Sequence, residues 1–488
     1  GADPFGWRPS LFFPVRNIPH SSTSPAPIQT VARLLHIITT QETPPAVHMI
    51  MNTGILTALN KIPEEGNKTR IQNGQTPKIR PVNSGSFMER IPSTILTKDP
   101  AVLKFSKSLQ NSGQYGLKPD GATQAAYKTQ QAYNNNKAIQ IDDQTGAFTN
   151  FPRTATDKIL QQHCPQLVQY FRTLYSKRSP SFYIYKKNGQ TFIRCIWSAS
   201  GVKQGNPLAS LLYNATAEYT FLIQLRKDYP NIELFSLTDD AIKIWKDTPT
   251  TADREEWISF YHQYEAFVKS IEKLQNPFGF TRAPEKSFLL VPRYAPLPLE
   301  LGIQSITSNI KRDGITIAGA PIGSTEFQKS FLHTKMDQVL AQTEAIIPFG
   351  QFFPQEAFRI LKLSTNHLLD YVARILPPST LAEFIMEYDD IIFSAALDLL
   401  YPGQLLPTIP ASRREIACIL MNLSHKHGGF QLPPLAWRSP ALFLSAVHNI
   451  SSLPGSTLQM QDQQENLQSA LDLLHTSFDK LSMGNLSS

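Results

Sequence analysis

Two short apolar stretches of the chain end in paired aspartates, and this pattern constrains the fold more than any other. Segment 138–143 reads AIQIDD, and segment 235–240 reads FSLTDD. Both have the character of β-strands, although strand interiors disfavour Asp and neighbouring carboxylates repel each other. If the two strands are neighbours in one sheet, three or four carboxylates converge, although 96 residues (239 − 143) separate the two pairs. We therefore expect a sheet that joins distant segments and carries an acidic cluster.

Such a cluster of carboxylates has a chemical use. Left uncompensated it is unfavourable, but two divalent metal ions would stabilise it. Mg²⁺ prefers carboxylate oxygens together with substrate phosphates, and a pair of such ions supports phosphoryl transfer. The alternative interpretation is that Asp142, Asp143, Asp239 and Asp240 are ordinary turn aspartates at strand ends. Only the surrounding motifs decide between the two.

Size and charge narrow the class of protein. The chain has 488 residues, of which 41% are hydrophobic and 17% charged, so two to four subdomains are expected. The net charge is +7, a modest basic excess that favours a polyanionic partner. Nine basic and four acidic residues lie in segment 61–107, and segment 166–194 has six basic residues and no acidic one.

The three cysteines, Cys164, Cys195 and Cys418, are far apart in the sequence. Their spacing excludes a zinc-finger pattern and argues against a disulfide framework, which favours an intracellular setting. No apolar run is long enough to predict a transmembrane helix.

Local patterns predict the order of elements. Segment 1–47 is rich in Pro, Ser and Thr and is expected to be an extended arm with a short helix near 28–39. Helices are predicted at 101–110, 122–134, 156–175 and 254–274, and a hairpin at 181–197 turns at Asn188-Gly189. Segment 280–322 is strand-rich, and helices follow from 327 to the end.

Seven motifs in a fixed order resemble those of reverse transcriptases, most closely the non-LTR retroelement type and its cellular relatives. The resemblance covers roughly residues 60–440. It rests on KIRPVNSGSFMERI (78–91), SGQYGLKPDGATQAAY (112–127), IQIDDQTGAFTNFPR (139–153), SGVKQGNPLASLLYN (200–214), FSLTDDAIKIW (235–245), FGFTRAPEKSFLL (278–290) and GITIAGAPIGSTEF (314–327).

The resemblance implies an α+β fold of the right-hand polymerase type, with an antiparallel palm sheet and an α-helical thumb. On this basis the chain is expected to divide into an extended N-terminal arm at 1–47, fingers at 48–138, a first catalytic palm strand at 139–149, a fingers–palm connection with a hairpin at 150–200, palm at 201–326, a helical thumb and connection at 327–450, and a C-terminal helix at 451–488.

The resemblance also implies an RNA-directed DNA polymerase that extends a primer by two-metal phosphoryl transfer. Aligning Ala147, Phe148 and Arg153 with the family pattern selects Asp143 rather than Asp142. Asp143, Asp239 and Asp240 would then be the catalytic ligands of Mg²⁺, with Mn²⁺ as a substitute. Lys286 would protonate the pyrophosphate leaving group, or else it is a surface lysine.

Five further residues would bind the nucleotide. Arg80 and Lys78 would neutralise the triphosphate, Gln204 and Gly205 would line the templating base pair, and Phe148 would lie under the sugar and exclude a 2′-hydroxyl. The alternatives are a solvated Arg80 and a buried core Phe148. The hairpin at 181–194 either stacks nucleic acid or packs on both faces, and we expect packing.

Three positions depart from the family pattern. Leu237 stands where an aromatic residue is usual, Gln144 replaces an aromatic residue, and Asn206 replaces the aspartate of QGDP. None removes a metal ligand. Together they raise the prospect of a diverged or domesticated enzyme.

The expected partners are an RNA template, a DNA or RNA primer and deoxynucleotides, with no membrane. No nuclease motif is apparent, so a partner nuclease or ribonucleoprotein is expected, in the nucleus rather than the cytoplasm, with an organelle left open. Two alternatives remain: a catalytically silent retroelement-derived scaffold that binds RNA in a ribonucleoprotein, and an RNA-templated RNA polymerase.

Overall fold

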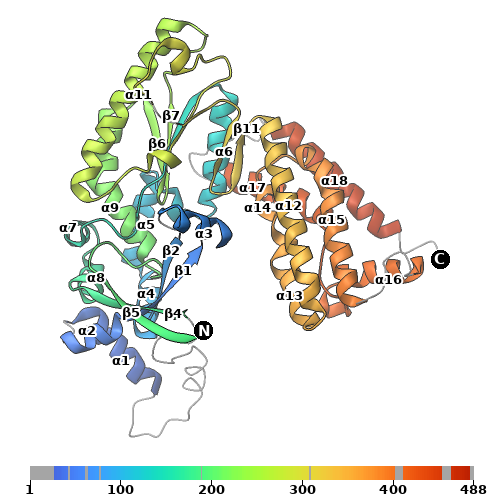
Figure 1. Ribbon diagram of the computed structural model, residues 1–488, viewed down its shortest axis with the longest axis horizontal. Coiled ribbons are helices and arrows are strands. Elements are labelled where there is room, and N and C mark those ends of the chain that lie inside the picture. The colour runs from blue at the N-terminus through green and yellow to red at the C-terminus, as the bar shows by residue number, and fades with distance from the viewer. Residues whose placement is uncertain are drawn as a thin grey trace. The chain divides into compact units, whose positions relative to one another are not determined.

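A computed structural model describes residues 27–41, 44–60, 64–75, 79–187, 189–306, 309–401, 410–452 and 463–483. The chain divides into two compact units. Unit 1 comprises Gly1–Gly121, Gln140–Phe288 and Pro296–Asn309, and unit 2 comprises Ala122–Ile139, Leu289–Ala295 and Ile310–Ser488. Strands and helices both occur in each unit, which confirms the predicted α+β class (Figure 1).

A five-stranded sheet carries both acidic segments. Its strand order is β6-β7-β3-β8-β9, so both acidic strands lie in one sheet, but they are not direct neighbours as expected: β7, which begins at Asp240, lies between β6 and β3. The strands are β3 (Ala138–Asp142), β6 (Ile232–Leu237), β7 (Asp240–Trp245), β8 (Phe288–Leu290) and β9 (Asn309–Lys311). Strand β3 is buried along its whole length, as expected for an apolar strand in the middle of a sheet.

Helix α11 (Arg254–Gln275) covers the β6–β7 hairpin (Figure 1). Asp253 caps its N-terminus by accepting hydrogen bonds from the backbone N–H groups of Glu255 and Glu256. Trp245 at the end of β7 packs edge-on against Phe260 and Phe267 at 5.2 and 5.3 Å between ring centroids. This aromatic layer fixes β7, and therefore the residues at its start, against the helix.

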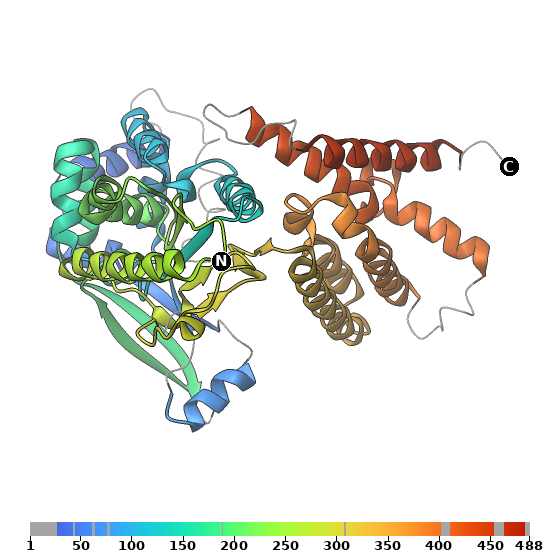
Figure 2. The same ribbon diagram turned by 90° about the horizontal axis from the view of Figure 1, so that it is seen from above.

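A second sheet has the strand order β2-β1-β4-β5. It contains β1 (Gly54–Asn60), β2 (Ile79–Gly85) and the long hairpin of β4 (Ser179–Lys187) and β5 (Gln190–Ser198), which Figure 2 shows as a twisted green ribbon. Helices of unit 1 surround the two sheets. They are α1 (Pro27–Thr40), α2 (Pro45–Met51), α3 (Glu64–Gln72), α4 (Phe87–Leu96), α5 (Pro100–Asn111), α7 (Arg153–His163), α8 (Val168–Tyr175), α9 (Ala209–Ala217) and α10 (Ile223–Asp228).

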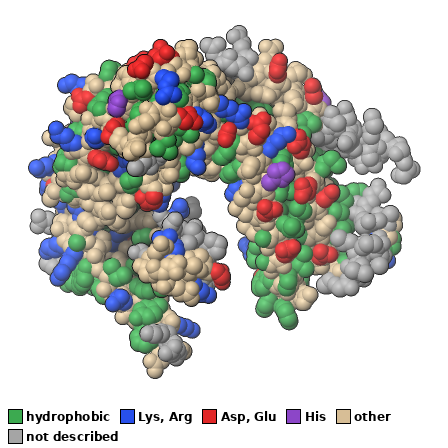
Figure 3. All heavy atoms as spheres, turned by 45° about the horizontal axis from the view of Figure 1, so that its top comes forward, with side chains coloured by type: hydrophobic (Ala, Val, Ile, Leu, Met, Phe, Trp, Pro, Cys, Tyr) green, Lys and Arg blue, Asp and Glu red, His purple; other side chains and the backbone are tan. Residues whose placement is uncertain are grey.

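Unit 2 is mainly helical. Leu332, Val339, Leu361, Leu381 and Phe384 belong to its largest apolar core. The elements of this unit are α6 (Gly121–Asn134), the hairpin β10 (Gly314–Ile317) with β11 (Ala320–Gly323), α12 (Thr325–Gly350), α13 (Pro354–Leu363), α14 (Asp370–Ala373), α15 (Pro378–Leu400), α16 (Ala411–Asn422), α17 (Leu435–Ser451) and α18 (Gln464–Met483). On the face of unit 2 visible in Figure 3, hydrophobic side chains are exposed beside carboxylates.

Two predictions about elements need correction. The single helix expected at 156–175 is two helices, because Pro165 follows Cys164 and cannot donate the helical hydrogen bond there. The hairpin expected to be packed on both faces is not, since every side chain of β5 except Ser198 is exposed. Helix α1 agrees with the helix expected near 28–39, whereas residues 1–26 of the predicted arm lie outside the described residues.

Within the described residues, no helix combines the length and the apolar character needed to cross a membrane.

Candidate active site

The two acidic strand ends come together in unit 1. Asp143 follows β3, Asp239 occupies the two-residue turn between β6 and β7, and Asp240 begins β7. Burial, together with the neighbouring carboxylates of Asp239 and Asp143, raises the pKa of Asp240 to about 7, although Lys286 opposes the rise. The three carboxylates therefore share one small region, where their charges repel each other.

Lys286 contacts this group directly. Its Nζ donates a hydrogen bond to Asp143 Oδ2 at 2.7 Å. The side chain of Lys286 is 40% exposed and that of Asp143 is 19% exposed, so the pair lies at the edge of the protein interior. Lys286 is therefore placed beside the predicted ligand Asp143, and not remote from it as an ordinary surface lysine would be.

Beneath the carboxylates lies Tyr213 of α9. Burial raises its pKa well above the ordinary value, and Asp239, Asp240 and Asp143 add to the rise. The ring of Phe148 stacks on that of Tyr213 at 5.2 Å between centroids. Phe148 is only half-buried, so it is neither a core residue nor a fully exposed one. This stacking fixes Phe148 close to the three carboxylates.

The turn that carries Asp239 is under strain and is supported from outside. Thr238 has φ 58°, a conformation that a β-branched residue rarely adopts. A Cβ atom on Gly116 would lie 2.5 Å from Thr238 Oγ1 and 2.8 Å from its backbone nitrogen. Nearby, Ser236 N–H donates to Gly113 O at 2.9 Å, and the rings of Tyr115 and Phe235 stack at 4.9 Å. Segment 113–116 thus packs against the turn and supports it, a role that the sequence did not predict.

Asp142, the neighbour of Asp143, is buried in a network of charges. Its Oδ1 accepts from Arg282 Nε at 2.6 Å, and its Oδ2 accepts from Gln140 Nε2 at 2.8 Å and from Lys243 Nζ. Burial alone would raise the pKa of Asp142, but Lys243 and Arg282 hold it below its ordinary value. Asp142 is thus fully engaged by these three side chains, whereas the role of Asp143 as a metal ligand stays a prediction.

The same network ties down the segment that carries Lys286. The backbone N–H of Ala283, next to Arg282, donates to Asp143 O at 2.9 Å. Lys243 and Arg282 were missed in the sequence, although a lysine within the apolar run AIKIW of β7 was the available signal. Both are positioning residues, because they act on the site through Asp142 and the backbone of Asp143.

The loop with Gln204 and Gly205 lies against β2. Asn83 N–H donates to Gln204 O at 2.8 Å, and a Cβ on Gly205, which has φ 118°, would lie 2.5 Å from Asn83 O. Only glycine allows this approach of the two backbones. The loop also joins the segment after Asp143, since Val202 N–H donates to Phe148 O at 2.7 Å.

Arg80 lies on β2 opposite Leu59 of β1, and its side chain is exposed. It stands three residues before Asn83, on the strand that the Gln204–Gly205 loop contacts. Lys78, the second predicted phosphate contact, lies outside the described residues. Their roles at a triphosphate stay predictions.

Buried side chains anchor the Gln204–Gly205 loop on both flanks. Lys203 Nζ lies 3.1 Å from Glu89 Oε2 on α4, and both side chains are only 2% exposed. Asn206 Nδ2 donates to Glu89 Oε1 at 2.8 Å, and Asn206 Oδ1 accepts from Leu208 N–H at 2.8 Å. The buried carboxylate of Glu89 thus holds both Lys203 and Asn206, the residues on either side of Gln204 and Gly205.

The donor set suits Mg²⁺ chemically, because Asp239 and Asp143 raise the pKa of Asp240, and a divalent cation would stabilise carboxylates that lie this close together. Across the described ranges, no three Asp, Glu, His or Cys side chains have the spacing of a formed metal site. The Mg²⁺ or Mn²⁺ assignment at Asp143, Asp239 and Asp240 therefore rests on the chemistry of the donors.

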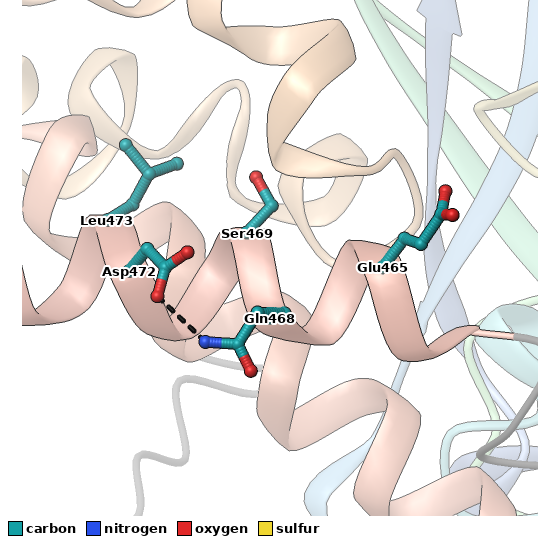
Figure 4. A pocket seen from close by; sticks show the side chains of 5 residues that line it. All are labelled: Glu465, Gln468, Ser469, Asp472 and Leu473. Atoms are coloured by element: carbon teal, nitrogen blue, oxygen red, sulfur yellow. Dashed lines mark hydrogen bonds between the residues drawn. The ribbon is translucent and has the colours of Figure 1, made fainter.

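Among the hollows in the described part of unit 2, two are well formed, and neither includes a predicted site residue. One, of about 520 Å³, lies along α18 and is lined by Glu465, Gln468, Ser469, Asp472 and Leu473 (Figure 4). There Gln468 Nε2 donates to Asp472 Oδ1 at 2.8 Å. The other, of about 590 Å³, lies between α6 and the start of α12 and is lined largely by amide and hydroxyl side chains.

Comparisons with known proteins find distant similarity to solved structures. No protein-family model matches the sequence, and no curated protein matches it. Among solved structures, apo telomerase from Candida tropicalis truncated from the C-terminal domain is similar at 12% identity and TM-score 0.33, over 62% of this chain and 61% of that one. Another apo telomerase structure from Candida tropicalis is similar at 11% identity and TM-score 0.36, over 76% of this chain and 67% of that one.

Telomerase from Candida albicans in complex with a fragment of telomeric RNA is similar at 11% identity and TM-score 0.37, over 91% of this chain and 68% of that one. This chain thus spans about three fifths to two thirds of the length of these telomerases. The structure is distantly similar to telomerase.

Proposed function

We propose that this chain is an RNA-directed DNA polymerase that adds deoxynucleotides to the 3′ end of a primer. One observation carries the proposal: Asp143, Asp239 and Asp240, from two distant segments, share one region with Lys286 on the carboxylate of Asp143. The seven ordered motifs of the sequence support the same reaction. The match to telomerase is too distant to add weight.

The proposal assigns parts of a right-hand polymerase to the chain. The five-stranded sheet and α11 would form the palm, the sheet with β1, β2, β4 and β5 would belong to the fingers and their connection, and the helices from α12 on would form the thumb. The exposed basic side chains of the fingers would contact the nucleic-acid backbone, which makes binding salt-dependent.

In the reaction, the primer 3′ oxygen would form a bond to the α-phosphorus of the nucleotide, the bond from that phosphorus to the oxygen bridging to the β-phosphate would break, and the proton of the 3′ hydroxyl would pass to solvent. Asp143, Asp239 and Asp240 would hold Mg²⁺, or Mn²⁺, which supplies charge neutralisation and a more acidic 3′ hydroxyl. Lys286 would give a proton from Nζ to the departing pyrophosphate. Its partial exposure leaves that atom accessible to a ligand.

Three other residues would orient the nucleotide. Arg80 would pair with the triphosphate through its planar guanidinium. Phe148, fixed by stacking on Tyr213, would lie under the sugar and exclude a 2′-hydroxyl. Gly205 would allow the backbone to approach the templating base pair, and Gln204 would flank it.

Primer extension tests the proposal. The native chain is incubated with an RNA template, a DNA primer, deoxynucleotides and Mg²⁺, and Asp143→Ala and Asp239→Ala serve as matched variants. We expect extension by the native chain and its loss in both variants, with RNA binding retained. If the native chain does not extend the primer and both variants bind RNA as it does, the polymerase proposal is wrong and the catalytically silent scaffold is favoured.

The reaction class has a specific alternative. If ribonucleotides are extended better than deoxynucleotides, and Phe148→Ala leaves the preference unchanged, the chain is an RNA-templated RNA polymerase. The proposed setting is intracellular and nuclear, with a partner nuclease or ribonucleoprotein that provides the primer end. Co-purification of a nuclease with the native chain from nuclear extract is the corresponding check.

A further inference from the structure

The hairpin of β4 and β5 has an unusually open surface. Strand β5 is at the edge of its sheet (Figure 2), and its residues are exposed from Gln190 to Trp197. Ile193 is 66% exposed, and Phe192, Ile196 and Trp197 are also exposed. Large apolar side chains concentrated on one ribbon are uncommon on a surface that contacts only water, and they mark an interaction site.

One face of the hairpin carries a row of aromatic rings. Tyr183 and Tyr185 stack at 5.5 Å between centroids with 21° between planes, and Tyr185 and Phe192 stack at 5.5 Å with 19°. Tyr183 is directly opposite Arg194 in the strand register, so the guanidinium belongs to the same face. The row thus combines flat rings in a common orientation with a cation at its side.

Charge on the hairpin has one sign. Residues 179–198 include Lys186, Lys187 and Arg194 and no Asp or Glu. On the other face of the hairpin, the guanidinium of Arg178 lies 4.8 Å from the ring centroid of Trp197. A surface with aromatic rings, exposed arginines and no carboxylate of its own complements a polyanion that carries flat bases.

We propose that the Tyr183–Tyr185–Phe192 row with Arg194 binds single-stranded nucleic acid, in addition to the primer end expected at the carboxylates. The proposal rests on the proposed function for the class of partner. Bases would stack on the ends and edges of the aromatic row, and Arg194 would contact a phosphate or stack on a base. The exposed edge of β5 also fits a protein strand, but such pairing through backbone groups gives no role to the one-signed charge.

Binding of a fluorescein-labelled oligouridine to the full chain, without nucleotides, tests this site by fluorescence anisotropy. We expect Tyr185→Ala and Phe192→Ala each to weaken binding by about tenfold, the usual effect of losing one stacking ring. Tyr185→Phe keeps the ring and should bind as the native chain does. Arg194→Gln should lower the slope of log affinity against log salt by about 0.7.

Ile193→Ser, on the opposite face of the same strand, is the matched control and should leave oligouridine binding unchanged. Native binding by Tyr185→Ala, Phe192→Ala and Arg194→Gln would overturn the proposal. Equal loss in Ile193→Ser would also overturn it, because the effect would then not belong to the aromatic face. A loss of self-association in Ile193→Ser, seen by sedimentation velocity together with unchanged oligouridine binding in the ring variants, would identify the ribbon as a protein contact.

Asp143→Ala is measured in parallel, so that the two proposals fail separately. If no chain extends a primer but the ring variants still lose oligouridine, the polymerase proposal fails and the hairpin site stands. If extension is normal and the ring variants bind oligouridine as the native chain does, the hairpin proposal fails and the polymerase proposal stands.

Discussion

The side-chain amide of Asn206 donates a hydrogen bond of 2.8 Å to Glu89 Oε1, inside the protein. This contact explains a departure from the reverse-transcriptase pattern, in which the position is usually aspartate. With Glu89 already paired to Lys203, an aspartate at 206 would bring a second carboxylate against the first. The asparagine is therefore the residue that suits its buried partner.

The variant Asn206→Asp restores the usual motif, yet we expect it to destabilise the protein. Replacing the donated hydrogen bond with carboxylate repulsion in the interior should lower the free energy of unfolding by about 2–3 kcal/mol. Urea denaturation measures the loss. The double variant Glu89→Gln with Asn206→Asp removes the repulsion and should recover part of it. An additive double-mutant cycle would show that the two side chains do not interact.

The variant Asp142→Asn should be more harmful than its conservative shape suggests. It leaves Lys243 and Arg282 buried without a compensating anion, and we expect a loss of about 3–5 kcal/mol in the free energy of unfolding. Removing one of the two uncompensated cations, by adding Lys243→Met to Asp142→Asn, should recover part of the lost stability. Equal stability of Asp142→Asn and the native chain would contradict the burial of this network.

The pKa of Asp240 gives the site a pH dependence. Because the folded state raises this pKa from 3.8 to about 7, the folded protein binds the extra proton, and the stability it gains is lost as pH rises from about 4 through 7. Asp240→Asn should therefore be more stable than the native chain at pH 8 in the absence of divalent ions, and equally stable near pH 4. Melting temperatures at the two pH values measure this difference.

The same measurement distinguishes a metal site from a simple acidic cluster. Mg²⁺ should raise the melting temperature of the native chain at pH 8, and raise it less at pH 5, where a proton takes the place of the cation. Asp240→Asn should respond less at either pH. A native chain whose melting temperature is indifferent to Mg²⁺ and Mn²⁺ at pH 8 would count against metal binding.

The variant Gly116→Ala should impair activity more than stability. The added methyl group would lie 2.5 Å from Thr238 Oγ1 and press on the turn that carries Asp239. Given the proposed polymerase, we expect kcat to fall about tenfold or more with little change in KM, as for a loss of alignment. Thr238→Gly removes the contacting hydroxyl and the backbone strain, so the double variant should regain part of the rate. Normal kcat in Gly116→Ala would show that segment 113–116 does not position the turn.

Sequence patterns predicted the elements whose cause is local. Apolar runs that end in paired acids indicated the strands, and the motifs around them, through their resemblance to reverse transcriptases, led to the expectation that Asp143 and Asp239 approach each other. The partners of Asp142 were not predictable in this way, because Lys243 and Arg282 are 101 and 140 residues away. Alternation in the β4–β5 hairpin was equally uninformative about exposure, since it cannot reveal whether a neighbouring element covers either face.

Asp142 and Asp143 are adjacent in sequence but lie in different environments. Asp142 is enclosed by cations, whereas Asp143 lies at the edge of the interior. The alternation of side-chain direction at the end of β3 turns the two carboxylates to opposite sides. Inserting or deleting one residue in β3 should therefore exchange them. The length of the strand is fixed by this requirement, and the spacing between Ala138 and Phe148 is as much a part of the site as the aspartates themselves.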